Sequence, residues 1–329
     1  MNYSKEELIG VYRNMIYMRT FEERLRRLFA KGVLPGILHL GVGQEACSAG
    51  TCFNLKEGDV IGSTHREKGV LLCQGIDLNA YMAEFYGKRT GSSKARGGDM
   101  HGAIPKNGAL GCNAILGPPQ TIINGYAFAM KFRKTDNVAV TIFGDGAANR
   151  GEFHEGMNMA SIWKLPTIFI IFNNGYAYNT PMSHATNVED FADRAAGYGI
   201  PGAAIDGNDI IAVMEAVGEA VKRARAGGGP SLIELKTYSQ HGHYAGEVRS
   251  YLPEGLHEEW MKKDPVDRFE KLLVEQGFAT QQDFDDIAAE YKALMDAAQK
   301  YAEMSPEPTR EDFEEALKDV YYYDEGGAV

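Results

Sequence analysis

The segment IFGDGAANRG (142–151) places one carboxylate, Asp145, between two glycines at the end of a strand-type run. The next strand-type run along the chain, TIFIIF (167–172), ends in a pair of amides, Asn173 and Asn174. The carboxyl ends of parallel strands share one edge of a sheet, where ligands collect. One helix and one strand fit between these polar groups, so we expect Asp145 and the Asn pair to meet at that edge.

A carboxylate, an amide oxygen and a freed backbone carbonyl are hard oxygen donors. Such a set suits Mg²⁺ or Ca²⁺, particularly when phosphate oxygens complete the coordination shell. Gly144 and Gly146 would let the backbone turn sharply and approach a ligand closely. In the alternative interpretation, Asp145 caps a helix starting near Ala147 and the Asn pair forms a turn. The convergence of two strand ends favours the metal–phosphate interpretation.

The surrounding elements alternate between strand and helix. Ser4 and Glu7 have capping-box spacing and open a helical pattern that ends near Gly32. Further strands and helices are expected at 138–143 (strand), along Phe153, Met157 and Ala160 (helix face), at 167–172 (strand), 209–226 (helix) and 231–238 (strand). This alternation predicts an α/β fold with a mostly parallel, doubly wound sheet flanked by helices. From about Pro265 the composition predicts a helical C-terminal tail packed on the core.

Composition excludes several functional classes. With 34 basic and 45 acidic residues among 329, the formal net charge is −11, which argues against a nucleic-acid binder. No apolar run approaches the roughly 18 residues of a membrane span, and no signal segment is evident. The four cysteines lack CxxC spacing and are expected to be reduced thiols. We therefore expect a cytoplasmic protein that acts on a small molecule, with neither nucleic-acid nor membrane partners.

A GDG segment followed about two dozen residues later by NN resembles the thiamine diphosphate motif. The longer segment GDGAANRGEFHEGMNMASIWKLPTIFIIFNNGYAYNTP resembles the α subunit of two-component 2-oxoacid dehydrogenases, a family that includes the closely related acetoin dehydrogenase. HLGVGQEA, STHREKG, RGGDMH, VDRF and SPEP stand in the order of that family, so the resemblance covers nearly the whole chain.

The resemblance implies a thiamine-diphosphate-binding fold over residues 1–260, with residues 261–329 as a helical extension of the same unit. It implies an Mg²⁺ ion held by the side chains of Asp145 and Asn174 and by the carbonyl of Tyr176. The expected cofactor-binding residues are His65, Arg66, Ala114, Leu116, Gly144, Asp145, Gly146, Ala147, Asn174, Tyr176 and His241. The expected catalytic residues are His39, His65 and His241.

Several of these residues have other plausible roles. Arg66 could form a surface ion pair with Glu67, and an apolar loop residue such as Leu116 is more often core filling. A lone histidine such as His39 is usually structural, whereas His241 and His243 lie in a Gly-flanked loop and are better candidates. A neutral imidazole could carry protons or polarise a carbonyl near pH 7.

The resemblance also implies partners. In this family the thiazolium ring of the cofactor stores the electrons released when a C–C bond breaks, and a glutamate from a β subunit activates it. No second, pyrimidine-binding domain is evident within 329 residues. We therefore expect the chain to hold half of an active site in an α2β2 heterotetramer, and to pass its acyl product to a lipoyl acyltransferase component.

Several positions depart from the family pattern. Phe172 stands where Glu is usual, Arg150 where Gln is usual, Asp99 where Ser is usual, and Lys68 where a His is often found. Pro118, Pro119, Ile122, Ile123 and Phe128 occupy a helix start where the family has small residues. Because of these departures, neither the local backbone conformation, nor the contact between subunits, nor the substrate follows from the resemblance alone.

HGHYAGEVRSY and STHR resemble the acetoin dehydrogenase version of these loops more than the pyruvate version. They favour acetoin or a related hydroxyketone or diketone as substrate. The alternative is the α subunit of a pyruvate or branched-chain 2-oxoacid dehydrogenase first component. An alternative of another class is a non-catalytic assembly paralogue, against which the intact Asp145, Asn174, Arg66 and His241 argue.

Overall fold

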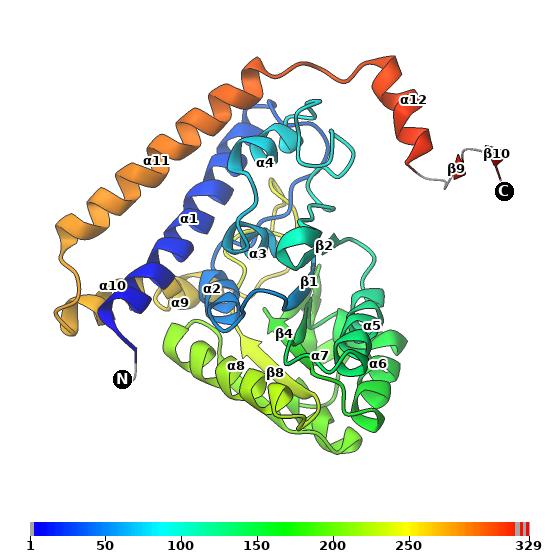
Figure 1. Cartoon of the computed structure of the whole chain (residues 1–329). Helices are drawn as coiled ribbons and strands as arrows, with labels where there is room; N and C mark the ends of the chain where they lie inside the picture. Colours follow the sequence, from blue (N-terminus) through cyan, green and yellow to red (C-terminus); the bar gives the residue numbers. More distant parts are fainter. Residues whose placement is uncertain (1–2, 320–322, 325–326, 329) are drawn as a thin grey trace.

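Six parallel strands form the centre of the protein (Figure 1). The structure, a computed structural model, describes residues 3–319, 323–324 and 327–328. The strand order is β2-β1-β3-β4-β8-β7. The strands are β1 (Val60–Thr64), β2 (Ala109–Asn113), β3 (Ala139–Gly144), β4 (Thr167–Asn173), β7 (Gly202–Asp206) and β8 (Ser231–Lys236). Short hairpins join β5 (Tyr176–Ala177) to β6 (Thr180–Pro181), and β9 (Tyr323–Asp324) to β10 (Gly327–Ala328).

Helices cover both faces of this sheet. They are α1 (Lys5–Ala30), α2 (Glu45–Phe53), α3 (Lys68–Cys73), α4 (Leu78–Phe85), α5 (Pro118–Phe132), α6 (Gly151–Ile162), α7 (Met182–Ala185), α8 (Ile210–Arg225), α9 (Leu256–Met261), α10 (Pro265–Glu275), α11 (Gln281–Met304) and α12 (Arg310–Lys318). Single turns or short stretches of 3₁₀-helix are η1 (Pro105–Asn107), η2 (Ala147–Asn149) and η3 (Phe191–Tyr198).

The core divides at the sheet into two clusters. Val140 and Ile142 of β3 pack in one cluster, with α1, α2, α8 and the helices around them. Ala139 and Phe143 of the same strand pack in the other, with α5 and α6. Successive strand residues point to opposite faces, so each buried strand needs apolar side chains at every position. The result is the predicted doubly wound α/β fold.

The strongest sequence patterns are confirmed. The strands predicted at 138–143, 167–172 and 231–238 are β3, β4 and β8, and the helix predicted at 209–226 is α8. The capping box is formed: Glu7 N donates to Ser4 Oγ at 3.2 Å, and Ser4 N donates to Glu7 Oε2 at 2.8 Å. Phe153, Met157 and Ala160 are buried on α6 as expected.

The helix cap of the alternative interpretation is not found among the described residues. No α-helix opens at Ala147: η2 occupies residues 147–149, and α6 begins only at Gly151. Arg150 is extended, with φ −81° and ψ 150°, and this conformation separates the two helical segments. Asp145 does not cap η2, which starts after Gly146 without a side-chain cap.

The Pro-rich start of α5 has a simple structural role. Pro118 and Pro119 lie in the first turn of the helix, where a missing N–H leaves no broken helical bond. Ile123 is buried and faces Gly62 of β1, whereas Ile122 and Phe128 are about half exposed. Of the large side chains in this segment, Ile123 therefore fills the core, whereas Ile122 and Phe128 lie partly on the surface.

Two of the C-terminal helices pack against the N-terminal helix α1. α10 and α11 pack against α1, where Phe269 and Phe284 contact Tyr12 (Figure 1). α12 stands apart from the body and has no buried residue, but Arg89 pairs with its Asp312 at 2.9 Å. The division of the chain into residues 1–260 and 261–329 stays a prediction.

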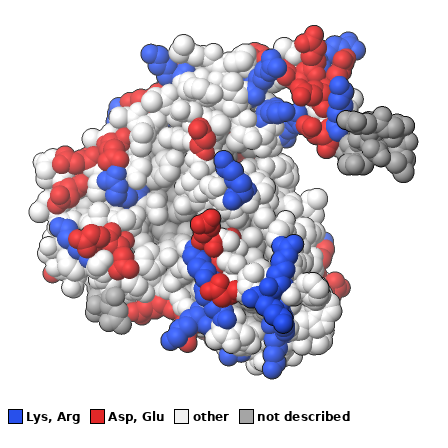
Figure 2. All heavy atoms as spheres, viewed as in Figure 1, with Lys and Arg blue, Asp and Glu red and all other residues white. Residues whose placement is uncertain are grey.

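The surface agrees with the charge pattern of the sequence. On the face shown in Figure 2, acidic and basic side chains are interspersed, both near the rim and across the centre of the view. Within the described residues, no helix is both long enough and apolar enough to cross a membrane.

Candidate active site

The carboxyl ends of five neighbouring strands gather around one cavity of about 330 Å³. Gly144 of β3 lies beside Phe172 of β4, so Asp145 and the Asn pair leave the sheet at the same level. The cavity is lined by Thr64, His65, Arg66, Glu67, Leu116, Gly144, Asp145, Gly146, Ala147, Phe172, Asn174, Tyr176, Ala177, Tyr178 and His243. The predicted meeting of Asp145 and Asn174 at one sheet edge is therefore seen in the structure.

Nine of the residues predicted to bind cofactor or metal line this cavity. They are His65, Arg66, Leu116, Gly144, Asp145, Gly146, Ala147, Asn174 and Tyr176. The structure does not bring Ala114, His39 and His241 to the cavity wall. Ala114 lies just beyond β2, His39 lies behind His65, and His241 belongs to a different cavity.

Asp145 is a buried carboxylate, 4% exposed, in the wall of the cavity. Burial raises the pKa of this carboxyl to about 6, and hydrogen bonds from its own amide and that of Gly146, with the charge of Arg66, offset the effect only in part. A divalent cation would supply the missing counter-charge, so the side chain fits a metal ligand.

The two asparagines after β4 have different environments. Asn173 donates to Glu234 Oε1 at 2.6 Å and accepts from Gly175 N at 3.0 Å, which ties the strand end to its neighbour. Asn174 accepts from Tyr176 N at 3.3 Å and lines the cavity. The turn expected in the alternative interpretation is therefore present. It also places Asn174, but not Asn173, on the wall of the cavity that contains Asp145.

Arg66 does not form a surface ion pair with Glu67. Its guanidinium donates to Leu40 O at 2.8 Å and His243 O at 3.1 Å, and lies 3.2 Å from His243 Nδ1. Glu67 is buried and bonded to Thr64 instead. Arg66 therefore stands as a fixed cation on the cavity wall, and a guanidinium can contact two phosphate oxygens at once.

Three histidines from separate parts of the chain form a cluster beside the cavity. The ring of His65 lies 4.3 Å from that of His39 and 6.0 Å from that of His243 between centroids. Burial, with the positive charges nearby, lowers the pKa of His65 to about 3 and that of His243 to about 4. Both imidazoles are therefore neutral at physiological pH. Both nitrogens of His65 are buried without a hydrogen-bond partner in the structure.

This cluster could in principle hold a metal, because one nitrogen from each of the three imidazoles lies within 4.8 Å of the others. The positive charge of Arg66 acts on both His65 and His243, that of Lys68 acts on His65, and both disfavour a further cation there. The arrangement suits proton transfer or hydrogen bonding to an uncharged carbonyl compound better.

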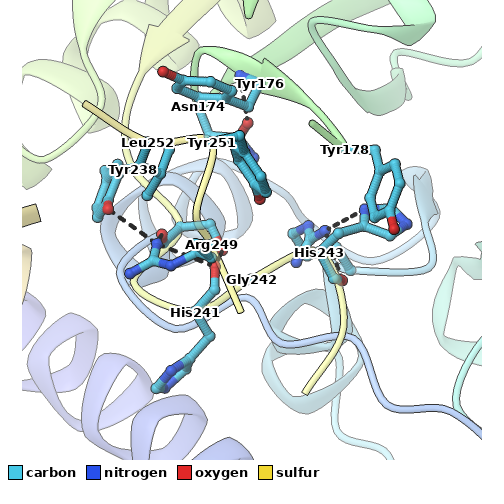
Figure 3. Close-up of a pocket in the computed structure, with 12 residues that line it drawn as sticks. Asn174, Tyr176, Tyr178, Tyr238, His241, Gly242, His243, Arg249, Tyr251 and Leu252 are labelled. Carbon is cyan, nitrogen blue, oxygen red and sulfur yellow. Dashed lines mark hydrogen bonds between the residues drawn. The ribbon is translucent and has the colours of Figure 1, made fainter. Parts of the chain in front are cut away.

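His241 points away from this cavity. Its Nε2 lies 3.0 Å from Glu23 Oε1 of α1, and in Figure 3 its ring extends toward that helix. It lines a smaller neighbouring cavity of about 30 Å³. His243, two residues further along the same loop, lines the larger cavity instead. A loop has no side-chain periodicity, so the sequence offered no signal to choose between the two.

Tyr178 is a cavity residue that the sequence gave no reason to select. It occupies the left-handed region at φ 58° in the β5–β6 hairpin, and its ring lies 4.8 Å from that of His243. A non-glycine residue in this region is uncommon outside tight turns and functional sites. Figure 3 shows Tyr178 and His243 side by side.

Two of the departures from the family pattern meet beside the histidine cluster. Lys68 Nζ lies 2.9 Å from Asp99 Oδ1, and both side chains are buried. Asp99 Oδ2 lies 2.6 Å from His39 Nδ1. Of the other departures, Phe172 is buried at the end of β4, and Arg150 forms an exposed pair with Glu152 at 3.1 Å.

Comparisons with known proteins agree with this geometry. Residues 12–311 match the family model described as dehydrogenase E1 component. The chain is 42% identical to the α subunit of acetoin:2,6-dichlorophenolindophenol oxidoreductase from Bacillus subtilis strain 168, covering 99% of this chain and 97% of that protein. It is 44% identical to the corresponding subunit from Cupriavidus necator, covering 96% and 95%. It is 38% identical to the pyruvate dehydrogenase E1 component subunit alpha of Rhizobium meliloti, covering 93% and 88%.

Proposed function

The chain belongs to the dehydrogenase E1 component family, and we propose that it is the α subunit of a thiamine-diphosphate-dependent enzyme that cleaves acetoin or a related hydroxyketone or diketone. The acyl group passes to a lipoyl acceptor. A β subunit supplies the activating glutamate, an α2β2 heterotetramer forms, and the enzyme works in the cytoplasm. The relatives named as acetoin oxidoreductase α subunits, which the chain matches over nearly their whole length, support this proposal.

The cavity residues fit the cofactor. Asp145 and Asn174 would hold Mg²⁺ through side-chain oxygens, and Tyr176 would hold it through its carbonyl. Arg66 would contact the diphosphate, with His243 beside it. Leu116 would give apolar support to the rings. Thiamine diphosphate, when bound, supplies a nucleophilic carbon and an electron sink for breaking a C–C bond.

The residues of this chain then have defined tasks. His65 and Asp145 are buried residues of the cavity wall, and both imidazole nitrogens of His65 are without a hydrogen-bond partner among the described residues. Because His65 is neutral, its imidazole can accept a hydrogen bond from a substrate hydroxyl or donate one to a carbonyl oxygen.

The lowered pKa values of His65 and His243 on the cavity wall favour an uncharged substrate. A 2-oxoacid carries a carboxylate and needs a cation near the reacting carbon. Lys68 cannot serve, because its ammonium is 0% exposed and already paired with Asp99. His65 and His243 are held neutral. Acetoin has no carboxylate and therefore needs no such cation. The uncharged imidazoles of the cavity thus support the same substrate class as the acetoin-type relatives.

A pyruvate or branched-chain 2-oxoacid dehydrogenase α subunit is the second candidate. It is favoured by the similarity to pyruvate dehydrogenase E1 α subunits, at 38% identity for the Rhizobium meliloti protein. The two candidates share the cofactor site and differ in whether the substrate is charged.

Reconstitution with the β-type partner tests the proposal. Turnover of acetoin, pyruvate and 2-oxoisovalerate is measured with 2,6-dichlorophenolindophenol as electron acceptor, in the presence of thiamine diphosphate and Mg²⁺. We expect kcat/KM for acetoin to exceed the others at least tenfold, or about 1.4 kcal/mol. A preference for either 2-oxoacid would establish the second candidate. Saturable cofactor binding without turnover of any of these substrates would indicate a non-catalytic assembly protein.

A further inference from the structure

Lys68 and Asp99 form a buried ion pair whose members are far apart in sequence and both depart from the family pattern. Lys68 Nζ lies 2.9 Å from Asp99 Oδ1, with the side chains 0% and 6% exposed. The same ammonium donates to the carbonyl of His65 at 3.2 Å and to that of His39. The buried ammonium is therefore compensated by two carbonyl oxygens and by the charge of one carboxylate.

Asp99 in turn holds His39 at two points. Its Oδ2 accepts from the His39 backbone amide at 3.0 Å and lies 2.6 Å from His39 Nδ1. Although burial opposes it, the charge of Lys68 and the hydrogen bonds from His39 and Lys68 lower the pKa of the Asp99 carboxyl. An ionised carboxylate can only accept, so Nδ1 must carry the proton. His39 Nε2 is then left with a lone pair.

His39 stands directly behind the residues that line the cavity. Its ring centroid lies 4.3 Å from that of His65 and 5.1 Å from that of His243. Of the three imidazoles, only His39 contacts a carboxylate in the structure. Asp99 therefore fixes the orientation of the His39 ring, and no carboxylate of the described residues does so for the other two.

We propose that Lys68 and Asp99 are positioning residues: Lys68 fixes Asp99, and Asp99 fixes His39 with its proton on Nδ1, so that His39 Nε2 is the proton-accepting atom of the histidine cluster. The inference rests on the proposed function, since it assigns a task within that site. Without Asp99, the ammonium of Lys68 would be a buried charge without a counter-ion. Without Lys68, the carboxylate of Asp99 would be in the same position.

Nitrogen NMR of histidine tests the positioning directly. The full chain, labelled with ¹⁵N-histidine and assembled with its β-type partner and cofactor, is measured without substrate, and His39 is assigned with a His39→Gln variant. We expect His39 to show the protonated-Nδ1 signature in the parent, and to lose it in Asp99→Ser and Asp99→Asn. The same signature in both variants would overturn the proposal. Because no substrate is present, this result does not depend on which compound the enzyme cleaves, so the positioning proposal can fail or hold independently of the proposed substrate.

Exchanging the pair toward the residues usual in the family tests the coupling. We expect Lys68→His and Asp99→Ser each to lower kcat/KM roughly tenfold to hundredfold, the range typical of groups that orient a functional histidine. We expect the loss mainly in kcat, with a displaced pH profile. The Lys68→His/Asp99→Ser double variant should lose little more activity than Asp99→Ser alone, because both exchanges act through the same contact with His39. Its urea midpoint should exceed the value expected from adding the single effects, because no unpaired charge stays buried. Strictly additive losses would overturn the coupling.

A matched control is available on the surface. Lys56 and Asp136 also form a Lys–Asp pair, but with side chains 48% and 66% exposed. Lys56→Met and Asp136→Asn should leave the His39 signal, the pH profile and kcat/KM unchanged, since exposed pairs contribute little. If these variants reproduced the effects of the Lys68 and Asp99 exchanges, the assignment of the buried pair to His39 would be wrong.

Discussion

Asp145 is a buried carboxyl group, and a bound cation would compensate its charge. It is 4% exposed on the cavity wall, and burial raises its pKa to about 6. We expect Asp145→Ala to weaken Mg²⁺-dependent binding of thiamine diphosphate at least roughly hundredfold, or about 2.7 kcal/mol. Titration calorimetry of the α–β complex at fixed Mg²⁺ measures this. The fold should survive, because removing a poorly compensated buried carboxylate carries little cost. Unchanged affinity would rule out Asp145 as a ligand.

The adjacent asparagines offer a sharper test, because their side chains have different partners. Asn173 bonds to the buried Glu234, whereas Asn174 lines the cavity. We expect Asn173→Ala to lower the free energy of unfolding by about 1–3 kcal/mol, because Glu234 loses a buried donor. Asn174→Ala should lower cofactor affinity and leave unfolding nearly unchanged. Urea unfolding and cofactor titration of both variants measure the contrast. The reverse pattern would show that the metal ligand is misassigned.

Glu22 makes stability depend on pH. It is fully buried on α1, and burial raises the pKa of its carboxyl to about 8, helped by Glu45 and opposed by Lys68, by the Gly41 amide and by Arg66. Between the unfolded pKa near 4.5 and about 8, the folded chain binds a proton that the unfolded chain lacks. The Glu22 contribution to stability is therefore complete below about pH 4.5. It is lost as pH rises to about 8, at roughly 1.4 kcal/mol per unit.

Glu22→Gln checks this sign. The glutamine cannot ionise but can still accept from Gly41 N. Relative to this variant, we expect the parent chain to become progressively less stable in urea unfolding from pH 5 to pH 8, and to change no further above pH 8. A constant difference between the two proteins over this range would mean that Glu22 is ionised throughout.

At the residue scale, the sequence predicted the groups that stand directly at strand ends. Asp145, Asn174 and Arg66 each follow a strand closely, so their position is fixed by the sheet. The choice between His241 and His243 depends on the path of an irregular loop. The pairing of Lys68 with Asp99 depends on how α3 and the loop before η1 pack. Neither leaves a periodic pattern in the sequence, so only the structure reveals them.

At the element scale, hydrophobic content decided which strands could be predicted. β3, β4 and β8 are apolar on both faces and read clearly as buried strands. β1, β2 and β7, with sequences VIGST, ALGCN and GAAID, are short and rich in small residues, and were not predicted. Their place in the sheet comes from pairing with neighbours, which a single sequence does not display.

Gly108 controls how β2 joins the sheet beside β1. It has φ 84°, and a Cβ there would lie 2.2 Å from the carbonyl oxygen of Asp59. Its own carbonyl accepts from Ile61 N at 2.8 Å. Gly108→Ala would both strain the left-handed backbone and push the strands apart. We expect a loss of unfolding free energy clearly above the roughly 1–2 kcal/mol for strain alone.

Gly75→Ala is the matched control. Gly75 has a similar φ of 79°, but a Cβ there would meet nothing closer than 3.6 Å. It should cost only the strain of the left-handed backbone. Urea unfolding of both variants gives the difference, which measures the contact between the two strands. Cofactor affinity should fall in Gly108→Ala alone, since β1 and β2 lead to Arg66 and Leu116. Equal losses in the two variants would show that strain alone acts at Gly108.

At the scale of the whole molecule, the proposed function makes this cavity one half of an active site that a partner subunit completes. The cavity residues come from the sheet edge of one chain, and the proposed chemistry needs a glutamate from a partner. The largest gathering of exposed aromatic side chains among the described residues lies on α5 and at the end of α6: Phe128 (49% exposed), Phe132 (79%) and Trp163 (47%). Phe128 contacts both other rings, with centroids 6.4 Å and 5.5 Å away.

We expect this aromatic patch, made of Phe128, Phe132 and Trp163, to contact another subunit in the proposed assembly. A contiguous apolar surface is costly in water and marks an interface, whereas scattered apolar residues do not. We expect the Phe128→Ser/Phe132→Ser double variant to weaken association in the proposed α2β2 heterotetramer by a few kcal/mol, roughly the cost of removing two anchoring aromatics. Analytical ultracentrifugation with the β-type partner measures it. Leu294→Ser, on an isolated exposed leucine of α11, is the control and should assemble normally. Because the exchanged side chains lie outside the cavity, tetramer that still forms should bind thiamine diphosphate as the parent does. A double variant that assembles like the parent would move the subunit contact to another face.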